Sequence, residues 1–147
     1  MYITILVGDI MESRIYITHC CAKKNDGLRD SGVAAQPQEL YTSAPTVRFM
    51  SRCKLLEVKW AIFSDLYGVW FPSERHEWYE KPPNEVTENE FRQLLSAFDA
   101  SLSPYEEIWF YHNPGRFHRL YRRIIADSRV NNHIHMFSSV YEISKAK

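Results

Sequence analysis

Cysteine is scarce in this chain, with three cysteines among 147 residues, and two of them, Cys20 and Cys21, are adjacent. An odd number of cysteines with a vicinal pair does not form a disulfide framework, because neighbouring cysteines rarely reach the geometry of a disulfide. We therefore expect free thiols and, since reducing compartments keep thiols free, a cytoplasmic protein.

Long apolar runs and an excess of charge are also missing. No stretch approaches the roughly 20 apolar residues that span a bilayer, which argues against a membrane partner. Residues 1–10 are apolar but lack a basic segment and contain Asp9, so we interpret them as an extension before Met11 or an added edge strand, not as a signal peptide. Eighteen basic residues balance eighteen acidic ones, so the overall charge does not favour nucleic acid, although a local basic patch would allow it.

The motifs of several large enzyme classes are absent. The chain contains no G-x-S-x-G, Walker loop, G-x-G-x-x-G or H-E-x-x-H, which excludes the motif-bearing hydrolases, NTPases, dinucleotide-binding enzymes and zinc proteases. His19, Cys20 and Cys21 are consecutive and poorly placed to supply three tetrahedral ligands, and no C-x₂-C or H-x₃-H pair accompanies them. We expect neither a metal nor a cofactor.

The apolar pattern predicts a single α/β domain over residues 1–147. Short runs rich in β-branched and aromatic residues predict strands at Ile15–Thr18, Lys59–Ser64, Ile108–Tyr111 and Ile134–Phe137, with Val140–Ile143 as a continuation or a further strand. Apolar residues at helical spacing predict helices that begin near Thr42–Pro45, after a capping box at Thr87–Glu90, and over Arg116–Ser128. Strands that alternate with helices indicate a mostly parallel sheet with helices on both faces, a three-layer sandwich.

A polar turn at Cys20–Lys24 ends the first predicted strand and is our main candidate site. Ligands of open α/β sheets lie outside the carboxyl ends of the strands. If the residues after Cys20 wind into a helical turn, Lys24 lies one turn away and lowers the pKa of the Cys20 thiol. The structural alternative is a buried free cysteine beside a solvated lysine pair.

Two further segments suggest ligand contacts. The long irregular segment Phe71–Pro83 carries Trp78 and Tyr79, whose rings could stack on a planar base or simply cover the edge of the core. Arg116 and Arg119 follow Asn113-Pro114-Gly115 at a helix start, where anions bind favourably, although a solvated helix face is the plainer reading.

The order of these elements resembles a known family. Cys20-x-x-x-Lys24 is followed by Leu40-Tyr41-Thr42-Ser43, by Ile62-Phe63-Ser64-Asp65-Leu66-Tyr67-Gly68 and by Tyr79. This order resembles the YaaA-like α/β domains of bacteria, archaea and phages, named after a peroxide-stress protein, over roughly residues 15–79. The C-x₃-K element with a later tyrosine and serine is also similar to the lysine-transferring domain of archaeosine synthase. That resemblance implies a candidate nucleophile at Cys20, directed at a deazaguanine nitrile in that enzyme.

These observations predict an enzyme that acts on a nucleotide or nucleobase: a transferase, glycosidase or lyase that modifies, transfers or cleaves at a base or its glycosidic bond. The expected catalytic residues are Cys20, Lys24, Ser64 and Tyr67. The expected binding residues are Tyr41, Ser43, Gly68, Trp78, Tyr79, Arg116 and Arg119. The alternative is a non-catalytic module that binds nucleic acid or a nucleotide, in a stress response, through Arg116, Arg119, Arg122 and Arg123. A third interpretation is a redox sensor built on Cys20 and Cys21.

Overall fold

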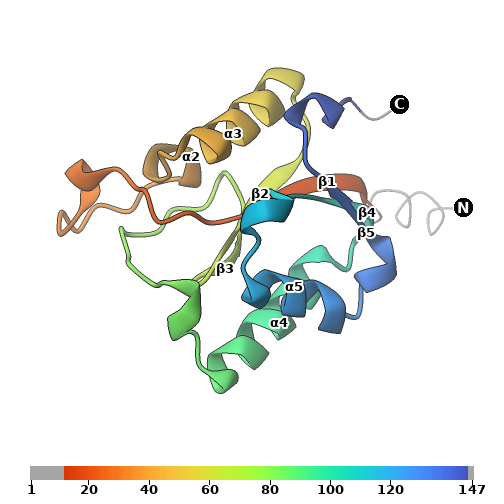
Figure 1. The fold of residues 1–147 in the computed structure, drawn as a ribbon. Coiled ribbons are helices and arrows are strands. Elements are labelled where there is room, and N and C mark those ends of the chain that lie inside the picture. The colour runs from red at the N-terminus through yellow and green to blue at the C-terminus, as the bar shows by residue number, and fades with distance from the viewer. Residues whose placement is uncertain (1–11, 146–147) are drawn as a thin grey trace, which may run out of the picture.

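Five strands form one sheet in the order β3-β2-β1-β4-β5, with β1 at its centre (Figure 1). The computed structural model describes residues 12–145, so the extension or edge strand expected at residues 1–10 lies outside the described residues. The strands are β1 (Glu12–His19), β2 (Trp60–Ser64), β3 (Gly68–Trp70), β4 (Tyr105–Tyr111) and β5 (Ile134–Phe137). β1 pairs in parallel with β2 and β4, β5 is parallel to β4, and β3 alone is antiparallel to its neighbour.

Helices cover both faces of this sheet. The α-helices are α2 (Pro37–Leu40), α3 (Ala44–Leu56), α4 (Glu88–Leu102) and α5 (Arg119–Asp127). Short 3₁₀ helices lie at Asp26–Leu28, Pro83–Glu85, Pro114–Arg116, Asn131–His133 and Val140–Glu142. Figure 1 shows α2 and α3 over one face, and α4 and α5 over the other. The predicted three-layer α/β fold with a mostly parallel sheet is confirmed. No helix in the described part of the chain is long and apolar enough to cross a bilayer.

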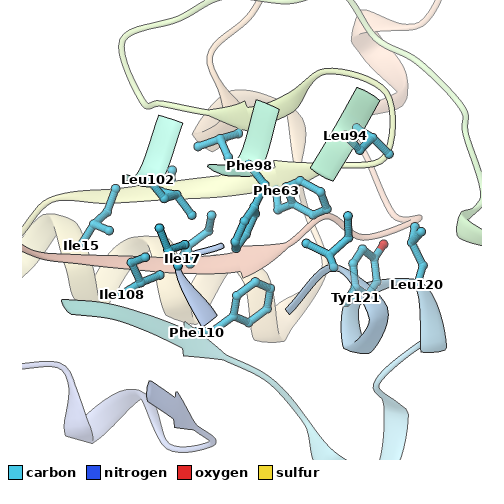
Figure 2. Close-up of a cluster of buried hydrophobic side chains, with 14 of the residues drawn as sticks. Ile15, Ile17, Phe63, Leu94, Phe98, Leu102, Ile108, Phe110, Leu120 and Tyr121 are labelled. Atoms are coloured by element: carbon cyan, nitrogen blue, oxygen red, sulfur yellow. The ribbon is translucent and has the colours of Figure 1, made fainter. Parts of the chain in front are cut away.

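The continuously apolar strands place side chains in two cores, one on each face. Ile15 and Ile17 point toward α4 and α5, where they pack in one cluster with Phe63 and Phe98 (Figure 2). Tyr16 points to the other face and packs against α3 in a second cluster. This alternation explains why β1 carries apolar residues at successive positions, as expected for a strand buried on both faces.

A side-chain cap marks the start of α4 but not that of α3. The Glu90 backbone N–H donates to Oγ1 of Thr87 at 3.1 Å and the Thr87 N–H donates to the Glu90 carboxylate at 2.9 Å, so the predicted capping box of α4 is confirmed. α3 has no such side-chain cap. Ser43 occupies the N-cap position, but its hydroxyl donates to Oγ1 of Thr46 at 2.9 Å and accepts no backbone N–H of the helix.

The structure differs from the predicted elements at three places. The last helix begins at Arg119 and not at Arg116, because Pro114–Arg116 forms a separate 3₁₀ turn and the His118 side chain caps α5. Val140–Glu142 is a 3₁₀ turn and not a strand. β3, which begins at Gly68 with φ +75°, was not among the predicted strands.

Candidate functional site

A cavity of about 370 Å³ lies at the carboxyl ends of β1 and β2. Its lining includes Cys20, Lys24, Asp65, Lys81, Arg116 and Tyr121. We call it the Cys20 cavity. It combines residues that follow two adjacent parallel strands with residues of α5 and of the segment before α4, and its volume is in the range of small-molecule sites.

Cys20 is held firmly at this place. Its backbone N–H donates to the Phe63 carbonyl at 2.8 Å, which extends the pairing of β1 and β2 by one residue. Its side chain is buried, and Sγ lies 3.6 Å from the Tyr121 hydroxyl. Burial raises the pKa of the Cys20 thiol to about 12, and the nearby Asp65 charge adds to the rise. The free protein therefore carries Cys20 as a thiol at neutral pH.

The prediction that Lys24 lowers the pKa of Cys20 is wrong. It assumed a helical turn after Cys20, but residues 21–24 form no helix, and Lys24 forms an antiparallel bridge with Tyr41. The Lys24 ammonium lies over the Tyr79 ring, 4.6 Å from its centroid. The pKa of Cys20 is therefore determined by burial and by the nearby Asp65 charge, and not by the lysines that lie close to it in sequence.

Alkylation of the free protein tests whether Cys20 is protonated at neutral pH. At pH 7.5 we expect iodoacetamide to modify the half-buried Cys21 first, and Cys20 about a thousandfold more slowly than an exposed cysteine, because only the thiolate reacts. Tandem mass spectrometry of the peptide that contains both residues measures the two rates. Faster labelling of Cys20 than of Cys21 would contradict the assigned protonation.

Asp65 is the main residue that the sequence interpretation missed. It directly follows β2, only 3% of it is exposed, and the Tyr121 hydroxyl donates to Oδ1 at 2.7 Å. Burial raises the pKa of Asp65 to about 6, although hydrogen bonds from Tyr121 and Cys20 and the charges of Lys24 and Lys81 oppose the rise. A carboxyl group with this pKa exchanges protons readily near neutral pH. The available signal was its position at the end of a continuously buried strand.

Ser64, Tyr79 and Tyr41 form a buried hydrogen-bonded chain beside this cavity. The Ser64 hydroxyl donates to the Tyr79 oxygen at 3.0 Å, and the hydroxyl oxygens of Tyr79 and Tyr41 lie 2.5 Å apart. Ser64 also accepts the backbone N–H groups of Leu66 and Tyr67 at 3.1 and 3.0 Å. Because Ser64 is fully buried with these partners, it shapes the turn that presents Asp65 and does not line the cavity.

The other aromatic candidates lie away from the Cys20 cavity. The Tyr67 ring stacks on His76 with centroids 4.0 Å apart, and its hydroxyl donates to the Glu77 carbonyl at 3.0 Å. Trp78 lies under the Arg29 guanidinium, 4.8 Å from the ring centroid. Neither residue, nor Gly68, is part of the cavity lining.

The four arginines of the α5 region do not form one patch. Arg116 lines the Cys20 cavity, whereas Arg119 faces a separate hollow beside α4. Arg122 donates to the Phe117 carbonyl at 3.2 Å, and Arg123 forms a bidentate ion pair with Glu88. Of this set, only Arg116 is placed to contact a ligand in the Cys20 cavity.

A second cavity, of about 560 Å³, adjoins the first and lies at the carboxyl ends of β1 and β4. It contains Ser43, the remaining predicted binding residue, and it shares His19, Cys21 and Arg116 with the Cys20 cavity. Among residues 12–145 no three His, Cys, Asp or Glu side chains are grouped so that they could hold a metal ion.

Comparison of the chain with models of protein families, with curated proteins and with solved structures found no match.

Proposed function

We propose that the protein is an enzyme that acts on a nucleotide or nucleobase in the Cys20 cavity. The observation that carries the proposal is a buried cluster at the ends of two adjacent parallel strands, in which the Tyr121 hydroxyl lies 3.6 Å from the Cys20 thiol and 2.7 Å from the Asp65 carboxyl, whose pKa is raised to about 6. Pairs of titratable groups whose environments perturb their pKa values cluster at functional sites. Lys24 and Arg116 in the same lining supply positive charge for an anionic substrate, whereas Lys81 is paired with Glu90 at 2.9 Å.

The pair supports nucleophilic chemistry with an internal base. As Cys20 Sγ forms a bond to an electrophilic carbon of the substrate, its proton passes to the Asp65 carboxylate. Protonated Asp65 then gives this proton to the leaving group, so that the carboxyl acts first as base and then as acid. The Tyr121 hydroxyl, which donates to Oδ1, holds the carboxylate in place.

The cavity walls favour a planar substrate. The His19 imidazole and the Tyr121 ring, both in the lining, stack with centroids 4.6 Å apart and planes inclined by 14°. Tyr121 is buried beneath this stack, so the partly exposed His19 is the ring of the pair that can offer a flat surface to a base, a contact worth about 1–3 kcal/mol. The resemblance of the Cys20, Tyr41, Ser64 and Tyr79 motifs to YaaA-like domains supports the same class of substrate.

A titration with free nucleobases and nucleosides tests the proposal directly. We expect at least one of adenine, guanine, cytosine, uracil or their nucleosides to shift the backbone amide signals of Cys20, Asp65 and Tyr121 in a ¹H–¹⁵N correlation spectrum. The signal of Lys54, an exposed residue of α3 that lines neither cavity, serves as the internal control. If none of these compounds shifts the cavity signals at millimolar concentration, the proposed function is wrong.

A further inference from the structure

The second cavity occupies the topological switch point of the sheet. From β1 the chain crosses through α3 to β2, and from β4 it crosses through α5 to β5, in the opposite direction and over the opposite face (Figure 1). The crossovers therefore diverge between the neighbouring strands β1 and β4 and leave a crevice at their carboxyl ends. We call the second cavity the switch-point cavity. Its lining includes Thr18, Ser43, Arg48, His112, Asn113 and Arg116.

The charge of this lining is purely positive. Arg48 and Arg116 both reach the switch-point cavity, and no Asp or Glu lines it. Among the described residues neither arginine forms an ion pair. The Cys20 cavity differs, because its lining includes two acids, Asp65 and Glu80. The switch-point cavity therefore offers an anion two arginines with no carboxylate beside them, whereas carboxylates partly offset the cations of the Cys20 cavity.

The neutral groups of the switch-point cavity fit a multidentate anion. Ser43 and Thr46 contribute hydroxyls, Asn113 contributes an amide, and all three line the cavity with the two arginines. Guanidinium groups bind phosphate oxygens through charge-assisted hydrogen bonds, which are stronger than neutral ones. Arg116 borders both cavities, so a ligand that spans them passes beside it.

We propose that the switch-point cavity binds the phosphate of a nucleoside phosphate whose base lies in the Cys20 cavity. This inference rests on the proposed function, because it assigns the base to the site of the thiol and the carboxyl. It narrows the substrate class from nucleobases in general to phosphorylated nucleosides.

Calorimetric affinities of nucleosides and their 5′-monophosphates test the assignment. We expect the monophosphate of the best-bound nucleoside to bind at least tenfold more tightly than the nucleoside. Arg48→Gln should weaken monophosphate binding about tenfold, the loss of one charged hydrogen bond, and leave nucleoside binding unchanged. The matched control is Lys54→Gln, which removes a cation from the same helix outside this cavity and should change neither affinity.

The possible outcomes separate this inference from the proposed function. Equal affinities for nucleoside and monophosphate, or a phosphate gain that survives Arg48→Gln, overturn the phosphate site while base binding still supports the enzyme. If no nucleoside or base binds, the proposed function fails, and a titration with inorganic pyrophosphate decides the anion site alone. The anion site is supported if pyrophosphate shifts the amide signals of Ser43 and Thr46 and these shifts disappear in Arg48→Gln. If pyrophosphate causes no such shifts in the parent protein, the anion site is overturned.

Discussion

Replacing Asp65 with asparagine should abolish turnover and, at pH 7.5, should stabilise the folded protein. The variant removes the base that accepts the Cys20 proton, and loss of a general base slows reactions by about 10²–10⁴-fold. In the parent protein, turnover should rise with pH through about 6, because the base must be ionised. Turnover of a ligand identified by titration measures both effects.

The effect on stability follows from the direction of the pKa change. The pKa of Asp65 is about 6 in the folded protein and about 3.9 in an unfolded chain, so the folded protein binds this proton more tightly. The resulting stabilisation is fully present below about pH 4 and is lost as the pH rises through 6. Ionisation of Asp65 thus lowers the free energy of unfolding by about 3 kcal/mol. Asp65→Asn avoids this loss because asparagine does not ionise.

Urea unfolding at pH 4.5 and 7.5 provides the measurement. The difference in unfolding free energy between the two pH values should become smaller in Asp65→Asn, with the change greatest at the higher pH. Glu80→Gln, at an exposed position in the same cavity, is the control and should behave like the parent protein. A variant that is less stable than the parent at pH 7.5, or one that remains active, would contradict the role given to Asp65.

Replacing Phe98 with alanine should lower the free energy of unfolding by about 3–5 kcal/mol, the usual cost of removing a buried aromatic ring. Phe98 is fully buried on the inner face of α4, and its ring meets Phe63 of β2 edge-on with centroids 5.4 Å apart (Figure 2). The substitution leaves a cavity between the helix and the sheet, which surrounding side chains fill only in part.

The midpoint and slope of urea unfolding, followed by circular dichroism, measure this loss. Leu95→Ala on the same helix is the control, since Leu95 is only partly buried and its truncation should cost less. A Phe98→Ala protein as stable as Leu95→Ala would show that α4 does not depend on this contact.

Much of the fold could be predicted because its determinants are local in sequence. The apolar runs at β1 and β2 and the capping box at Thr87 act over a few residues, and the structure contains them as expected. The end of the chain was harder to predict. Val140–Glu142 has strand-like residues, yet it turns as a 3₁₀ helix and packs against α3, a contact that no local pattern reveals.

Residues of the candidate site were predictable where a local pattern marks them, as the end of a strand does for Cys20 and the predicted helix start does for Arg116. Cys20 and Lys24 were identified from the end of β1, and both line the cavity. Tyr121 reads as an ordinary core residue on the apolar face of α5, and its bond to Asp65 joins residues 56 positions apart. The pKa of Cys20 was misjudged for the same reason, since its neighbours in space, and not those in sequence, determine it.

The pairing of β1 also has a consequence for the order in which the protein folds. Thr18 of β1 donates to the Tyr111 carbonyl of β4, and these residues are separated by 93 positions in the chain. Closing so long a loop costs conformational entropy before the strand contacts form, and non-local pairing of this kind slows folding. During synthesis Cys20 leaves the ribosome well before β4 and α5 exist. The thiol is therefore buried beside Tyr121 only after most of the chain has been made.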